Sequence, residues 1–353
     1  MSCLESVRGQ SLPPIEVIVV NDGSIDQTQE VAERARARGL ITRLIRHGTR
    51  CGKSAALNHA FRFARGTLVL VIDDDTNLAP HAIRELAGAF NDEKVAVASG
   101  NLGIRQRRTL VASLQAIEYL VTLTSGRQFL DMFNRAASCS GAFQMFRRDV
   151  YLAVGGMDVG PGEDLEITLR LRRLGYDVRF IATAQATIVG PETFPALVRQ
   201  RLRWDRDALA IRIFRYHNVR VSQPGETLST ALQRVDFVLF EFISTFIYIP
   251  SLFYLYVEAQ ENFTLFIGGV YCVLLVLALL QIGLAVIHDR SRAIGPYELL
   301  SVLIFPIYQG VVMKVVRLYA FSTELFFAHS QRDDFVPRRV RRALYDRDGR
   351  SSR

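Results

Sequence analysis

Two apolar runs in the first hundred residues each end abruptly in polar or acidic side chains. Residues 69–72 read Val-Leu-Val-Ile and are followed by three aspartates, and residues 15–20 are followed by Asn-Asp-Gly-Ser. An apolar run with no polar face is typical of a strand buried on both sides of a parallel sheet. In open α/β sheets, the carboxyl ends of the strands form the edge where ligands bind. The pattern therefore places Asp22 and the aspartate triplet at one ligand-binding edge.

The triplet Asp73, Asp74 and Asp75 has two interpretations. Three neighbouring acids repel each other unless a cation or water relieves the charge, and a hard divalent ion is held by one or two carboxylates together with substrate phosphates. Alternatively, the triplet is a solvated acidic turn that caps the next helix, expected at residues 80–90.

Strand-like and helix-like segments alternate along the first half of the chain. Besides the two strands above, we expect helices at residues 4–8, 26–38, 52–58 and 80–90, and strands at residues 40–46 and 95–99. This alternation predicts a doubly wound parallel sheet. A long helical stretch follows at residues 109–133. The next segment, residues 138–146, has small side chains followed by apolar ones. It is either a strand that passes close to a ligand or a segment that packs in the core without a functional role.

Lys53 lies in a Gly-Lys-Ser sequence that opens a predicted helix. This order is similar to a phosphate-binding loop, but the required spacing is absent because His47 stands where the first glycine would be. Phosphate binding and a plain helix start with an exposed lysine are both compatible with the motif.

Glu163 and Asp164 follow a glycine-rich segment and begin another predicted helix, which extends to residue 172. Acids in a first helical turn are favoured by the helix dipole, and this gives them a purely structural explanation. The alternative is a carboxylate general base at the ligand edge of the sheet.

Residues 193–216 are strongly basic and helical in pattern. Gln200 and Arg203 are three residues apart and share a helix face, next to Trp204, the only tryptophan. A basic and aromatic helix suits a membrane surface. It also suits a phosphate clamp with a stacking platform.

Two later stretches, residues 236–257 and 264–287, are each about one membrane thickness long and mostly apolar. The loop between them contains acids without Lys or Arg and is expected on the outer side of the membrane. The loop with Asp289, Arg290 and Arg292 is basic and is expected on the cytoplasmic side. A third stretch, residues 297–313, is interrupted by Pro306. It either spans, which places the arginine-rich tail outside against the positive-inside tendency, or is re-entrant.

The composition agrees with a membrane-associated chain. Of the 353 residues, 49% are hydrophobic, and the net charge of +8 comes mostly from arginines clustered at residues 199–220 and 332–353. Arginines beside apolar runs mark the cytoplasmic membrane face, and no nucleic-acid recognition motif accompanies them. The four cysteines, Cys3, Cys51, Cys139 and Cys272, form no CxxC pair, which argues against a zinc site and a disulfide framework.

Five of these motifs occur in one order: NDGS at 21–24, GKSAALN at 52–58, DxD at Asp73 and Asp75, ED at Glu163–Asp164, and QRLRW at 200–204. Together with the apolar stretches, they resemble the membrane-bound family 2 glycosyltransferases, which include cellulose, chitin and hyaluronan synthases. The chain is most similar to the poly-N-acetylglucosamine synthases of that group. The resemblance implies an α/β, Rossmann-like A-type glycosyltransferase domain followed by transmembrane helices.

The resemblance also implies roles on the donor side. Asp22 is expected to contact the uracil end of a UDP-sugar, while Lys53 and Arg203 are expected to lie at the diphosphate. Asp73 would contact the nucleotide and share Mg²⁺ or Mn²⁺ with Asp75.

On the acceptor side, Asp164 matches the family's general base, which deprotonates the acceptor hydroxyl. Gln200 and Trp204 belong to the QxxRW motif, which closes over the diphosphate and the acceptor end and is associated with processive enzymes. Ser140 and Gly141 are expected to border the acceptor pocket.

This gives a four-part organisation: a cytosolic transferase domain (1–192), a basic interfacial segment (193–235), transmembrane helices (236–321) and an arginine-rich tail (322–353). The implied partners are a UDP-sugar, a polysaccharide acceptor, the cell-membrane bilayer and an export or accessory protein. The family's first strand would precede Leu4, and we expect its absence to expose apolar surface. Three activities stay open: a processive polysaccharide synthase, single-sugar transfer to a lipid carrier, and an inactive membrane-anchored remnant.

Overall fold

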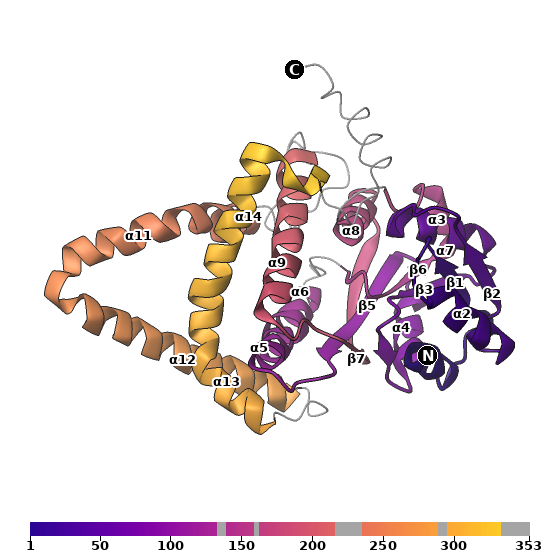
Figure 1. Ribbon diagram of the computed structural model, residues 1–353, viewed down its shortest axis with the longest axis horizontal. Helices are drawn as coiled ribbons and strands as arrows, with labels where there is room; N and C mark the ends of the chain where they lie inside the picture. The colour runs from indigo at the N-terminus through magenta and orange to yellow at the C-terminus, as the bar shows by residue number, and fades with distance from the viewer. Residues whose placement is uncertain (133–138, 159–161, 216–234, 289–294, 333–353) are drawn as a thin grey trace, which may run out of the picture.

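The computed structural model describes residues 1–132, 139–158, 162–215, 235–288 and 295–332. Its strands and helices form an α/β body at one end and an apolar helical part at the other (Figure 1). The strands are β1 (Ile18–Asn21), β2 (Arg43–Arg46), β3 (Leu68–Ile72), β4 (Asn77–Leu78), β5 (Val95–Ile104), β6 (Phe143–Arg147) and β7 (Asp177–Ile188).

The helices of the α/β body are α1 (Ser2–Arg8), α2 (Thr28–Ala37), α3 (Lys53–Phe63), α4 (Ala82–Gly88), α5 (Leu110–Glu118), α6 (Arg127–Met132), α7 (Arg148–Ala153), α8 (Glu163–Arg173) and α9 (Phe194–Leu209). Those of the apolar part are α11 (Ser244–Ala259), α12 (Phe263–His288), α13 (Pro296–Ile307) and α14 (Met313–Phe327). The predicted helices and strands of the first hundred residues are all present, with shifted ends.

The strands form two sheets, and this corrects the prediction of one doubly wound parallel sheet. β1 and β2 pair in parallel as a two-stranded sheet, and the second sheet has the order β3-β6-β5-β7-β4. The larger sheet is mixed, because β6 is antiparallel to both β3 and β5. The chain enters β6 beside the carboxyl end of β3, where Phe143 pairs with Ile72, so β6 must run back towards the opposite edge.

β7, the longest of the described strands, was not predicted from the sequence. It pairs in parallel with β5 along most of its length. Buried side chains such as Val178, Phe180, Ala184 and Ala186 recur at even spacings along it, which is the period expected of a strand. β5 is also longer than expected, and all ten of its residues are buried.

An open cavity of about 2200 Å³ lies between β1 and β3. Its lining includes apolar side chains of both strands, among them Val19, Leu70 and Val71. The prediction that β1 and β3 are buried on both sides was therefore wrong: of their apolar side chains, only Val71 is fully buried. Apolar side chains of both strands are thus partly exposed at this cavity.

Two helices of the α/β body pack against the apolar helices. α5 contributes Leu114 and Ile117, and α9 contributes Leu197, to a hydrophobic cluster shared with Ile282 of α12 and Phe305 of α13. α9 also lies alongside α14 (Figure 1). A displacement of the apolar helices would consequently shift the position of α9.

Two helical runs are long and apolar enough to cross a membrane, judged by length and composition: Phe237–Ile287 and Tyr297–Phe327. The first run contains both predicted spans, because α11 and α12 are two arms that meet near Gln260, which has a positive φ (Figure 1). In the second run Pro306 does not end the helix, which continues through a π-helical segment, Tyr308–Val312. The basic loop at residues 289–292 and the tail beyond Arg332 lie outside the described residues.

Candidate functional site

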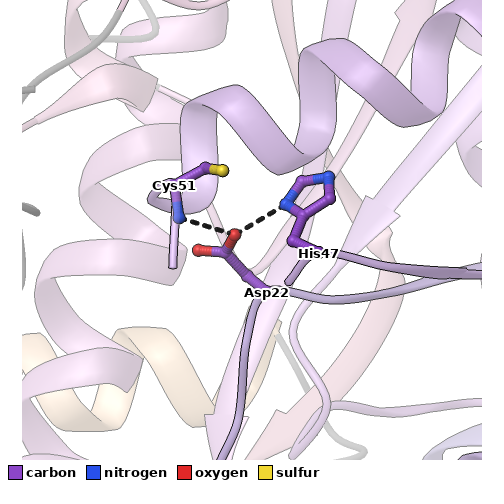
Figure 2. Close-up of side chains that lie close together, drawn as sticks. All are labelled: Asp22, His47 and Cys51. Atoms are coloured by element: carbon purple, nitrogen blue, oxygen red, sulfur yellow. Dashed lines mark hydrogen bonds and ion pairs between the residues drawn. The ribbon is translucent and has the colours of Figure 1, made fainter. Parts of the chain in front are cut away.

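The Asp22 carboxylate at the end of β1 is held by backbone donors from the segment before α3. The Cys51 N–H donates to one of its oxygens at 2.8 Å, and the His47 imidazole lies 2.7 Å from the same oxygen (Figure 2). The Gly52 N–H donates to the other oxygen at 2.6 Å. Gly23 makes the turn possible, since its φ is +72° and a Cβ there would lie 2.7 Å from the Arg50 nitrogen. The side chain is thereby fixed at the rim of the cavity.

Lys53 joins the ends of three elements. Its Nζ lies 2.6 Å from Asp73 Oδ1, 3.3 Å from the Gly141 carbonyl oxygen and 3.9 Å from Glu163 Oε1. Burial opposes its charge, but Asp73, Glu163 and Asp164 outweigh this effect and raise the pKa of Lys53. The ammonium group is therefore firmly protonated beside the acidic groups.

The three aspartates after β3 have different surroundings. Asp73 and Asp74 line the cavity, whereas Asp75 is half-buried and accepts a hydrogen bond from the backbone N–H of Val189. Burial, with the charges of Asp73 and Asp74, raises the pKa of Asp75. Hard carboxylate oxygens under mutual repulsion form a donor set that suits Mg²⁺ or Mn²⁺.

The two acids at the start of α8, Glu163 and Asp164, have different neighbours. Glu163 lines the cavity near Lys53, while Asp164 Oδ2 accepts a hydrogen bond from the Gly141 N–H at 3.0 Å. Burial is the main cause that raises the pKa of Glu163, and the Asp164 charge adds to it. The preceding Gly162 has φ +68°, and a Cβ there would lie 2.5 Å from the Ile211 side chain, so α8 begins in close contact with the segment after α9.

The basic motif lies on α9, where its three residues have separate surroundings. Arg203 lines the cavity together with Asp207. The Gln200 side-chain oxygen is buried and has no hydrogen-bond partner among the described residues. Trp204 packs against the core of the larger sheet, and the Arg201 guanidinium lies 4.6 Å from its ring centroid.

Most of the predicted site residues thus converge on one edge of the two sheets. Asp22, Lys53, Asp73 and Arg203 line one cavity, and Asp164 lies behind it against the segment with Gly141. The segment at residues 139–146 does approach the site, because the backbone of Gly141 contacts both Lys53 and Asp164. Residue 138, its first predicted position, falls outside the described residues.

Two features of this edge were not predicted from the sequence. The first is that Glu163, rather than Asp164, faces Lys53. The second is the position of His47, which contacts Asp22 and lies 2.9 Å from His59 Nδ1 through its Nε2. The sequence signal for this contact was weak, because it consisted only of one histidine after β2 and one within α3.

Comparison with known proteins identifies the class of the protein. Residues 1–206, more than half of the chain, match the family described as "Glycosyltransferase like family 2". The chain belongs to this family and is a family 2 glycosyltransferase.

The chain is similar to poly-beta-1,6-N-acetyl-D-glucosamine synthases of two staphylococci. It is 26% identical to that of Staphylococcus epidermidis over 250 residues, which cover 70% of this chain and 58% of the relative. It is 28% identical to that of Staphylococcus aureus (strain COL) over 191 residues, covering 54% and 46% respectively. The chain thus matches about half of the length of these curated relatives.

Among solved structures, the fold is similar to that of a mannosyltransferase from Pyrobaculum calidifontis, solved in complex with GDP-Man and Mn²⁺. The TM-score is 0.57 at 17% identity, and the match covers 92% of this chain and 82% of the other. The mixed sheet with flanking helices is therefore a glycosyltransferase A-type fold.

Proposed function

We propose that this protein transfers N-acetylglucosamine from UDP-N-acetylglucosamine to a growing polysaccharide at the membrane. The observation that carries the proposal is the convergence of Asp22, Lys53, Asp73, Glu163 and Arg203, from five separate motifs, on one cavity. Similarity to poly-beta-1,6-N-acetyl-D-glucosamine synthases supports this choice of sugar and product.

The donor would bind across the mouth of the cavity. Asp22, held by two backbone N–H groups, offers an acceptor to the uracil edge. Lys53 and Arg203 would pair with the diphosphate, since charged donors make the strongest hydrogen bonds to phosphate. Asp73 and Asp75 would hold Mg²⁺ or Mn²⁺, and their oxygen-only donor set fits these hard ions. When bound, such an ion offsets the charge that develops on the leaving diphosphate.

The reaction would be a single displacement with inversion. The acceptor hydroxyl oxygen attacks the anomeric carbon while the bond from that carbon to the diphosphate breaks, and UDP leaves with the electron pair. Asp164 would take the hydroxyl proton, because a hydroxyl ionises far above neutral pH and needs a base as attack develops. Lys53 and Arg203 would stabilise the leaving group electrostatically.

The acceptor would enter along α9 and the segment with Ser140 and Gly141. The buried Gln200 oxygen without a described partner supports this direction, since a sugar hydroxyl would satisfy it. The partly buried Trp204 would contribute a ring edge to the same path. The position of α9 between the cavity and α14 suits processive elongation, with the product passing towards the membrane and any export protein.

The apolar helices would place the protein in the cell membrane as a multi-pass protein with its transferase domain in the cytoplasm. Large apolar side chains are exposed along α11 and α12, among them Phe253, Leu265, Leu284 and Ile287. Such a surface is stable in lipid and unfavourable in water.

The first test is UDP release by membranes that contain the protein. We expect release with UDP-N-acetylglucosamine and Mg²⁺ or Mn²⁺, loss of release with a chelator, and loss with Asp164→Asn. Sizing the product then separates a long polysaccharide from a lipid carrier with a single sugar. Folded protein that binds UDP but releases none from UDP-N-acetylglucosamine would contradict the proposed donor.

A further inference from the structure

A carboxylate, an imidazole and a thiol meet at one point beside the cavity. Asp22 follows β1, His47 follows β2, and Cys51 precedes α3 (Figure 2). One possible ligand atom from each of the three lies within 4.8 Å of the other two. The three side chains are half-buried, so they are fixed by their surroundings and still open to an ion from solvent.

This set of atoms has the composition of a zinc site. Zn²⁺ is bound tetrahedrally by carboxylate oxygen, imidazole nitrogen and thiolate sulfur, whereas Mg²⁺ and Mn²⁺ favour oxygen donors. Zinc–ligand distances of about 2.0–2.3 Å require ligand atoms roughly 3.3–3.8 Å apart. The His47 Nδ1 and Asp22 oxygen, now 2.7 Å apart and sharing a hydrogen bond, need to separate by less than about 1 Å to admit the ion.

We propose that Asp22, His47 and Cys51 form a Zn²⁺ site with an open fourth position. The charges agree with this assignment, because one carboxylate and one thiolate neutralise a divalent ion in a half-buried setting. The site shares no residue with the oxygen donors Asp73 and Asp75.

Groups behind the three side chains hold two of them in position. His47 Nε2 lies 2.9 Å from His59 Nδ1, which leaves the His47 Nδ1 directed at Asp22. A metal-bound imidazole usually gives its other N–H to such a partner, and His59 is placed to accept it. The backbone N–H groups of Cys51 and Gly52 hold the Asp22 carboxylate, so it does not depend on the ion for its orientation.

The position of this site gives it a regulatory consequence, which rests on the function proposed above. Asp22 is the residue assigned to the uracil edge, and both Asp22 and Cys51 line the donor cavity. A Zn²⁺ ion on Asp22 would occupy the acceptor that the nucleobase needs. Zinc and UDP-sugar are therefore expected to compete, so that Zn²⁺ inhibits by raising the apparent KM for the donor.

Co²⁺ is the probe for the site, because a cobalt–thiolate bond gives a charge-transfer absorption that carboxylate ligands do not. The full chain in detergent, with Mg²⁺ in excess to fill oxygen-only sites, is titrated with Co²⁺ and then with Zn²⁺ to displace it. We expect one thiolate-bound Co²⁺ per chain. Cys51→Ser should abolish the band, and His47→Gln should weaken Co²⁺ binding about 10- to 100-fold.

The exposed thiol of Cys272 provides the matched control. Cys272→Ser should retain the band, and unchanged intrinsic tryptophan fluorescence should show that each variant is folded. A band that survives Cys51→Ser, or that disappears with Cys272→Ser, would overturn the site.

UDP then tests the competition separately. Saturating UDP should weaken Co²⁺ binding to the wild-type protein at least about 10-fold if both use Asp22. Binding of UDP without any loss of the cobalt band would overturn the inhibitory role and leave the metal site standing. Because the cobalt titration contains no sugar donor, a failure of the proposed transferase activity would not change its outcome.

Discussion

Lys53 Nζ lies 2.6 Å from Asp73 Oδ1, so the first turn of α3 is tied to the end of β3 beside the cavity that both residues line. In this pair, Lys53 can exchange its partner Asp73 for a bound diphosphate. Binding of a diphosphate would draw the ammonium group away from Asp73 and release a carboxylate oxygen towards a divalent ion. We therefore expect UDP and the ion to bind cooperatively, each favouring the arrangement that the other needs.

Replacing Lys53 by methionine tests this exchange. Lys53→Met removes a charged phosphate donor whose contribution is about 1.5–3 kcal/mol, so the Kd for UDP should rise about 10- to 100-fold. Isothermal titration calorimetry with UDP in the presence of Mn²⁺ measures this Kd. Lys94→Met, at an exposed lysine away from the cavity, is the matched control and should bind UDP as the wild type does. Equal Kd values for both variants would remove Lys53 from the donor site.

The neighbouring acids Glu163 and Asp164 should affect turnover differently. Asp164→Asn removes the proposed base, and kcat should fall about 10²- to 10⁴-fold with little change in donor KM. Glu163→Gln leaves Asp164 in place but removes a carboxylate beside Lys53, so the main effect should be on donor KM. Steady-state kinetics of UDP release separates the two. A larger loss of kcat in Glu163→Gln than in Asp164→Asn would assign the base to Glu163.

Glu163 should also make the stability depend on pH. Burial raises its pKa above the ordinary value of 4.5, so the native state holds this proton more tightly than the unfolded chain does. The stabilisation from this proton is complete below about pH 4.5 and is lost as pH rises through the raised pKa. Glu163→Gln, which stays neutral, should therefore unfold at a higher temperature than the wild type near pH 7, and at a similar temperature near pH 4.

Thermal unfolding in detergent, without divalent ions, is the measurement for this difference. Glu93→Gln at an exposed position provides the control, and its unfolding temperature should follow the wild type at both pH values. A Glu163→Gln protein that is less stable than the wild type near pH 7 would mean that the ion pair with Lys53 outweighs the cost of burying the carboxylate.

The sequence predicts local structure and the positions of the motifs well, because both depend on near neighbours. The helix after Gly52 and the strand before Asp73 form where the pattern places them. The helix that begins at Glu163 also forms where the pattern places it. Five motifs in one order were enough to expect the transferase family, which the match over residues 1–206 confirms.

What the sequence does not show is how segments far apart combine. The direction of β6 depends on the edge at which the chain enters the sheet, and no local pattern encodes that edge. The cysteine spacing also gave no sign that Cys51 and His47 would lie beside Asp22, which happens because the loop after β1 meets the loop between β2 and α3. Likewise, which of Glu163 and Asp164 faces Lys53 follows from the rotation of α8 against its neighbours.

An ion pair links the apolar helices to α9, the helix that carries Arg203. Arg317 on α14 lies 3.3 Å from Asp205 on α9, two residues from Arg203, and both side chains are partly buried. Burial raises the pKa of Asp205, although Arg317 and Arg201 favour its charged form. Arg317→Met leaves Arg201 as the remaining positive charge that favours this carboxylate, and should destabilise the protein by about 1–3 kcal/mol.

The double variant Arg317→Met/Asp205→Asn separates the ion pair from the packing of α14. If the pair is the main effect, the double variant should recover most of the unfolding temperature that Arg317→Met loses, with a coupling of about 1 kcal/mol or more. Because α9 carries Arg203, the single variant should also bind UDP more weakly, and the double variant should regain part of that affinity. Additive losses in the double variant would mean that the two helices are joined by packing, and that the charge pair has no part in placing Arg203 at the cavity.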